Sequence, residues 1–169
     1  MSLREPLLAE LNQESKGTRT TLERLPEDHL EWRPHPKSMT LGELATHLAN
    51  VGSWTAVTVK QERFDMEPPG ETPPRQEPLG SRQAILDLLD KNLAEARDAL
   101  SAASDEDLLV PWTLMKGGET LFTMPRVAVL RSFILNHAIH HRAQLGLYLR
   151  LLDVPVPGLY GPSADEMPA

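Results

Sequence analysis

The sequence of 169 residues contains no cysteine. This absence excludes disulfide bonds, thiolate metal ligands and a cysteine nucleophile, and it leaves the redox compartment undetermined. Aromatic residues make up only 5% of the chain, so leucine, valine and alanine must supply most of the core. Because leucine and alanine are good helix formers and β-branched residues are sparse, this composition favours a helical architecture.

Basic residues are fewer than acidic ones: 17 lysines and arginines against 24 aspartates and glutamates give a net charge of −7. Such a chain repels phosphate backbones and no run of basic residues offsets this, so we expect no nucleic-acid partner. No segment resembles a signal peptide or approaches the roughly 20 apolar residues that span a bilayer. We therefore expect a cytoplasmic protein that has no membrane partner.

Apolar residues recur at steps of three and four in four stretches, which is the spacing of one helix face. Thr40 and Glu43 fit a capping box at the start of the second stretch, and Ser81 fits an N-cap for the third. Pro125 is acceptable in the first turn of the last stretch. The predicted helices cover residues 3–24, 41–61, 82–102 and 125–152.

Two of the connecting segments have a pattern of their own. Residues 65–80 contain five prolines and therefore form a long crossover, of the kind that often joins parallel neighbours in a bundle. Residues 110–123 predict a small hairpin around Gly117 and Gly118. The length suits one core, so we predict a single domain over residues 1–169 of the all-α class, a four-helix bundle.

The six histidines of the chain are not equivalent. His137 and His141 are four residues apart, so their side chains stand one turn apart on the apolar face of the last helix. Burying an unpartnered imidazole costs roughly 1–3 kcal/mol, and a divalent ion removes this cost by taking a lone pair from each ring. His47 lies mid-helix on the apolar side of the second helix, which makes it the best candidate for a third ligand.

The other three histidines fit a shared site less well. His29 and His35 lie in a proline-rich connection and are expected to be exposed. His140 lies about 100° around the helix from His141, which turns it away from the apolar face.

Three interpretations of this pattern stay open. Three neutral histidine ligands leave an open coordination position, which is typical of a catalytic ion that activates a water or a thiol. Alternatively, the protein is a non-catalytic binding bundle whose metal is structural or whose pocket holds a ligand. In the third interpretation no metal binds and the histidines are hydrogen-bonded core residues.

Several segments resemble the DinB/YfiT-like family of helical-bundle metalloenzymes, and the likeness extends over nearly the whole chain. Segment 136–144 (NHAIHHRAQ) looks like the family signature HxxxHR-G-Q, with Ala143 where glycine is usual. Segment 44–48 (LATHL) is similar to the family's first metal histidine, and the segments 32–34 (WRP) and 160–166 (YGPSADE) are also like family members.

This resemblance implies an up-down-down-up bundle that is often a homodimer. It also implies that His47, His137 and His141 are the metal ligands, with nickel or zinc as the usual ion. Some relatives use low-molecular-weight thiols as cosubstrates in S-transfer or isomerisation, and others hydrolyse amides. The substrate would then be a small molecule, and the chain a metal-dependent transferase or hydrolase.

Other polar residues around the histidines have more ordinary interpretations. Asn50 lies one turn beyond His47, where an exposed or capping amide is the simpler expectation, and Trp54 is expected to be core or pocket wall. Arg142 is expected at a surface or dimer contact. Asp165 and Glu166 fit an exposed tail better than a general base or substrate contact.

Overall fold

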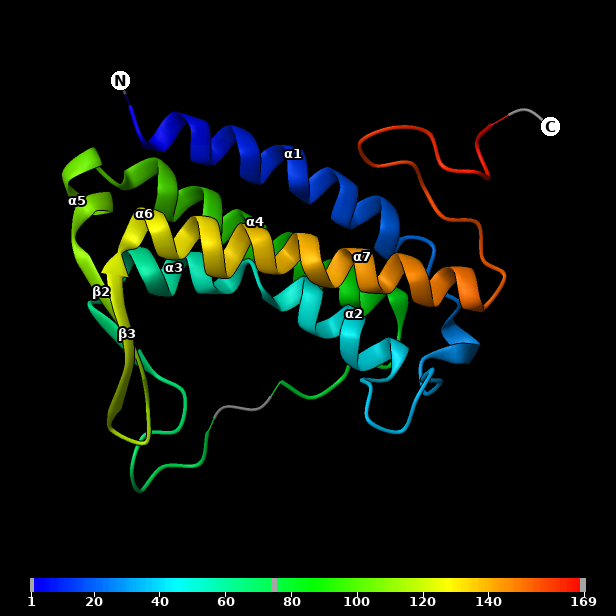
Figure 1. Cartoon of the computed structure of the whole chain (residues 1–169), viewed down its shortest axis with the longest axis horizontal. Helices are drawn as coiled ribbons and strands as arrows, with labels where there is room; N and C mark the ends of the chain where they lie inside the picture. The colour runs from blue at the N-terminus through cyan, green and yellow to red at the C-terminus, as the bar shows by residue number, and fades with distance from the viewer. Residues whose placement is uncertain (1, 74–75, 168–169) are drawn as a thin grey trace.

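The computed structural model describes residues 2–73 and 76–167 of the chain, and it is mostly helical (Figure 1). The helices are α1 (Arg4–Leu22), α2 (Leu41–Asn50), α3 (Ser53–Lys60), α4 (Arg82–Ala102), α5 (Asp105–Leu109), α6 (Arg126–Val129) and α7 (Asn136–Leu151). A short 3₁₀ turn, η1 (Glu27–His29), follows α1, and a π-helical segment, η2 (Leu130–Leu135), joins α6 to α7.

Contacts at the helix ends fix how the long helices run. The Arg4 guanidinium donates to the Ser101 carbonyl at 3.1 Å, and that of Arg82 donates to the Leu25 carbonyl at 3.2 Å, so α1 and α4 are antiparallel. An ion pair of 3.3 Å joins Arg131 to Glu10, which places the start of the last helix beside the first half of α1. In Figure 1, α1 and α6–α7 run left to right, and α2–α3 returns right to left.

The sequence signals for helix starts are confirmed. The Thr40 hydroxyl accepts from the Glu43 N–H at 3.1 Å, and the Glu43 carboxylate accepts from the Thr40 N–H at 2.7 Å, which completes the capping box of α2. The Ser81 hydroxyl accepts from the Ala84 N–H and caps α4. These caps satisfy N–H groups that have no partner inside the helix, and they set where each helix begins.

Two predicted helices are interrupted. The helix expected over residues 41–61 divides into α2 and α3, because Trp54 and Thr55 bond to carbonyls three residues back rather than four. The helix expected over residues 125–152 contains η2, where the Asn136 N–H bonds to the Arg131 carbonyl five residues back.

The chain also contains a three-stranded sheet, so the all-α expectation holds only in part. Strands β2 (Pro111–Lys116) and β3 (Glu119–Pro125) form the predicted hairpin, with Gly117 and Gly118 at positive φ, as this tight turn requires. Strand β1 (Arg63–Asp65) adds to β2 in parallel, with Phe64 opposite Leu114. The sheet lies at one end of the helices (Figure 1).

Leucine provides most of the core, as the composition predicts. Leu22, Leu25, Leu41, Leu145 and Leu149 have no exposed surface at all. The buried cluster draws on α1, α2, α4 and the last helix, so these elements share one core. No helix in the described part of the chain has the length and apolar character needed to cross a membrane.

Candidate metal centre

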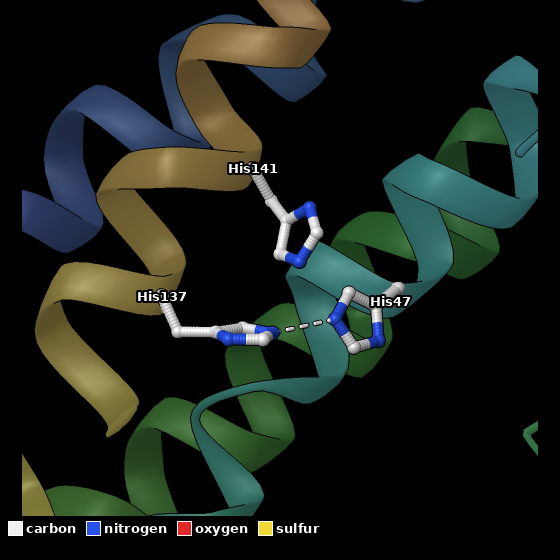
Figure 2. Close-up of side chains that lie close together, drawn as sticks. All are labelled: His47, His137 and His141. Carbon is white, nitrogen blue, oxygen red and sulfur yellow. Dashed lines mark hydrogen bonds between the residues drawn. The ribbon is translucent and has the colours of Figure 1, made fainter. Parts of the chain in front are cut away.

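Three histidine rings meet where α2 faces α7. One ring nitrogen from each of His47, His137 and His141 lies within 4.8 Å of the other two. Figure 2 shows the three rings pointing toward a common point. The ring centroids are 5.1 Å apart for His47 and His137, 4.5 Å for His47 and His141, and 4.4 Å for the pair on α7. The predicted convergence of two helices on one point is therefore found.

The nitrogens are close enough to share an ion. Nε2 of His47 lies 2.9 Å from Nε2 of His137. Two nitrogens each about 2.0–2.1 Å from a zinc ion stand roughly 2.9–3.4 Å apart, depending on the angle at the ion. The three-histidine cluster could therefore hold a metal ion.

The protein environment holds these rings in the neutral form. Burial, followed by repulsion from His141, lowers the pKa of His47 from 6.5 to about 4. Burial and repulsion from the neighbouring histidines lower the pKa of His137 to about 4 as well. The pKa of His141 is also lowered, chiefly by burial. A neutral imidazole has the free lone pair that a metal requires.

Gln144 fixes the orientation of the His141 ring. Its side-chain oxygen lies 2.7 Å from Nδ1 of His141, so it accepts the Nδ1–H hydrogen bond and leaves Nε2 of that ring as the acceptor. Hydrogen bonds of this kind select the tautomer and the ring orientation of metal-binding histidines. The Gln144 of the signature therefore supports the third ring.

Arg142 was expected at a surface or dimer contact, but its side chain is buried, with only 2% exposed. Its guanidinium donates to the Glu14 carboxylate at 2.6 Å and to the Glu14 carbonyl at 2.7 Å. The Tyr160 hydroxyl donates to the same carboxylate at 2.6 Å. A Cβ at position 17 would lie 2.9 Å from the guanidinium, so Gly17 provides the clearance. Arg142 thus joins α7 to α1 and to the tail.

The remaining sequence expectations are resolved as follows. His29 and His35 are exposed, and His140 is exposed beside His141 with its ring centroid 4.9 Å away. Asp165 and Glu166 do not reach the histidines. Asp165 pairs with the Arg150 guanidinium at 2.6 Å, and Glu166 accepts from the Gly158 N–H, so both hold the tail in place.

A cavity of about 530 Å³ opens beside the rings, and sequence reasoning did not foresee it. His47 and Asn50 stand on its wall with Trp54, whose ring centroid is 5.2 Å from that of His137. The rest of the wall comes mainly from α3, β1, the β2–β3 hairpin and the α6–η2 segment. The cavity exists because the hairpin and η2 come together there, and no local sequence signal predicts that meeting.

A second hollow, of about 550 Å³, also reaches His47 and has a more polar lining. Arg33, Lys37 and Glu43 line it, and it shares His47 and Gln76 with the apolar cavity. The centre is therefore approached by two hollows of different chemical character.

The fold and the site define a class: a mostly helical protein with three histidines from two helices gathered at one point. The DinB superfamily profile matches residues 10–145, and the chain belongs to this superfamily. It is 28% identical over 158 residues to YrdA of Bacillus subtilis strain 168, an uncharacterized protein, covering 90% of this chain and 85% of YrdA.

Two crystal structures have the same fold. A DinB-like protein from Bacillus cereus aligns with a TM-score of 0.71 and 25% identity, over 92% of this chain and 97% of its own. The DinB-like protein YjoA from Bacillus subtilis aligns with a TM-score of 0.65 and 17% identity, over 89% of this chain and 96% of its own.

Proposed function

We propose that the protein is a metal-dependent enzyme that acts on a small molecule at a divalent ion held by His47, His137 and His141. The observation that carries this proposal is the convergence of three imidazoles from two helices, with one nitrogen of each ring within 4.8 Å of the other two, beside a cavity of about 530 Å³. When bound there, a nickel or zinc ion supplies Lewis acidity that activates a thiol or a water.

The reaction we propose is transfer to or from a low-molecular-weight thiol, with amide hydrolysis as the second form of the same chemistry. The two hollows favour the first form, because a reaction between two substrates needs two approaches to one centre. Arg33 and Lys37 line the polar hollow, and their charge suits an acidic thiol. The apolar cavity then takes the other substrate.

Other parts of the proposal concern the assembly. We propose that residues 1–169 act as one domain, that α1, α2–α3, α4 and α6–α7 serve as an up-down-down-up four-helix bundle, and that the protein is cytoplasmic. We also propose a homodimer. Leu147 and Leu151 stand one turn apart on α7, and each is more than half exposed, which favours a contact there.

Elemental analysis of untagged protein tests the metal site directly. We expect close to one nickel or zinc per chain, and loss of that metal in His141→Ala. His140→Ala is the matched control, because this neighbouring histidine is exposed and should leave the metal content unchanged. Full metal occupancy in His141→Ala would refute the ligand assignment.

A second measurement separates an enzyme from the alternative, a non-catalytic metal- or ligand-binding protein. The metal-loaded protein is given bacillithiol, mycothiol or glutathione with an electrophile, and amide substrates in parallel. We expect turnover that is lost when the metal is extracted and restored when it is returned. A metal-loaded protein that binds these compounds and turns none over would favour the binding protein.

A further inference from the structure

The cavity beside the histidines is uncharged and largely apolar in the described part of the chain. Its wall includes five aromatic rings besides His47, and none of its described lining residues is an aspartate, glutamate, lysine or arginine. The lining includes His47, Asn50, Ser53, Trp54, Trp112 and Phe133. Pockets of this size and character bind small molecules through apolar contact, with a few polar groups for orientation.

The aromatic wall is built from separate elements that hold each other in place. Phe122 on β3 stacks on Phe133 of η2 with centroids 4.5 Å apart and planes 20° from parallel. Trp112 on β2 lies 6.4 Å from Phe122 and is 4% exposed. An aromatic or branched aliphatic group would replace water in this space, which is favourable in proportion to the apolar area covered.

One polar group on the cavity wall is held in a fixed orientation. The Asn50 side-chain oxygen accepts from the Asn92 amide at 3.3 Å. The Ser53 hydroxyl lies 3.4 Å from the same oxygen, but it donates to the Asn50 backbone carbonyl at 2.8 Å. Asn92 is itself 4% exposed and also donates to the Ala49 carbonyl at 3.1 Å, so it cannot rotate freely. Within the described residues the Asn50 amide nitrogen donates no hydrogen bond.

We infer that the cavity binds a neutral, mainly apolar molecule that carries one acceptor oxygen, such as a carbonyl, and that Asn50 recognises this oxygen. Asn50 follows His47 by three residues on α2, so its amide and that ring share a side of the helix. The acceptor oxygen is thereby brought next to the histidine centre. The inference rests on the proposed function only for what happens to the oxygen afterwards.

Three small ligands of one size test this inference without any reaction. Acetophenone is neutral with a carbonyl, ethylbenzene has the same outline without an oxygen, and benzoate is charged. Binding is followed by NMR through the indole N–H signals of a ¹⁵N-labelled protein. Trp54 and Trp112 line the cavity and should shift, whereas Trp32, which packs on Tyr148 with centroids 5.6 Å apart, should not.

We expect acetophenone to bind roughly three- to tenfold more tightly than ethylbenzene, which is the range of one net hydrogen bond. Asn50→Ala should abolish this preference and leave ethylbenzene binding unchanged. Asn12→Ala on α1 is the matched control, since Asn12 is exposed and pairs with Arg97, and it should keep the preference. A preference that survives in Asn50→Ala would overturn the role of that residue.

Benzoate is compared on protein from which metal has been extracted, because a cation at the histidines would attract it whatever the cavity prefers. We expect no cavity shifts from benzoate at a concentration that saturates with acetophenone. Equal binding of the two would overturn the neutral-ligand inference. Metal content is measured on the protein as purified, before any extraction. If the protein binds acetophenone selectively but carries no stoichiometric metal, only the proposed function is contradicted. If it carries the metal but the indole signals do not shift with the ligands, only this inference is contradicted.

Discussion

The guanidinium of Arg142 and the carboxylate of Glu14 form an ion pair at 2.6 Å, although 128 residues separate them and the Arg142 side chain is only 2% exposed. Arg142 follows His141 directly on α7, and Glu14 lies on α1. The ion pair therefore fixes the helix that carries two of the three histidines against its neighbour.

We predict that Arg142→Ala destabilises the fold by about 3–5 kcal/mol, because it leaves the Glu14 carboxylate buried without its partner. Denaturant unfolding followed by circular dichroism measures this. Arg150→Ala is the matched control, since Arg150 is also on α7 and ion-paired but is 45% exposed, and it should cost no more than about 1 kcal/mol. Similar losses in the two variants would contradict the structural role of Arg142.

Gln144→Ala should weaken metal binding by about tenfold to a hundredfold while keeping all three proposed ligands, because the His141 ring loses the group that sets its orientation and tautomer. Competition with a chromophoric chelator measures the affinity. Gln83→Ala serves as the control, because Gln83 is exposed on α4 and donates to the neighbouring Asp87 carboxylate, away from the histidines. Unchanged affinity in Gln144→Ala would show that the hydrogen bond is incidental.

The metal-free protein should lose stability as pH falls from about 6.5 to about 4. In that window the histidines of the unfolded chain, whose pKa is ordinary, bind protons. His47 and His137 of the folded protein, with pKa values of about 4, stay neutral. Below pH 4 both states are protonated and this contribution is constant.

The check on this pH dependence is urea unfolding at pH 7, 5.5 and 4. A double variant, His47→Leu with His137→Leu, should lose less stability over the same range, since carboxylates titrate equally in both proteins. Parallel curves would mean that these two histidines do not cause the effect. For the same reason, metal affinity in the native protein should persist below pH 6.5 and decline toward pH 4.

Asp65→Ala should loosen the hairpin that encloses the apolar cavity. The Asp65 carboxylate accepts hydrogen bonds from the backbone N–H groups of Gly117, Gly118 and Glu67, at 3.0, 2.7 and 2.9 Å. We expect faster hydrogen exchange at those amides and weaker acetophenone binding. Asp87→Ala, an exposed aspartate on α4, should change neither, and an unaltered exchange rate in Asp65→Ala would refute the idea.

Much of the helical part could be predicted from the sequence because its signals are local. The capping box of Thr40 and Glu43 and the N-cap Ser81 depend on residues three apart, and the histidine pair depends on one helix turn. His47 could be added because its place on an apolar face fixes its direction. The two segments that resemble the family also indicated His47, His137 and His141 as metal ligands.

The features that could not be predicted depend on distant segments. The parallel pairing of β1 with β2 joins Phe64 to Leu114 across 50 residues, and no turn between them sets the register. The π-helical bonding of η2 has no residue signature, and the burial of Arg142 depends on its pairing with Glu14. The cavity is lined by residues of β1, β2 and η2 together, so it could not be predicted from any one segment of the sequence.

The clearance at Gly17 has a consequence for how the protein folds. Glycine in the middle of a helix costs roughly 1 kcal/mol relative to alanine, so the first helix is intrinsically weak at the point where it meets Arg142. In the folded protein this part of α1 packs against Arg142 of α7, a contact to a segment more than a hundred residues later in the chain. A peptide of residues 3–25 should show little helicity by circular dichroism, and N-terminal fragments of the nascent chain should stay protease-sensitive until α7 has been synthesised.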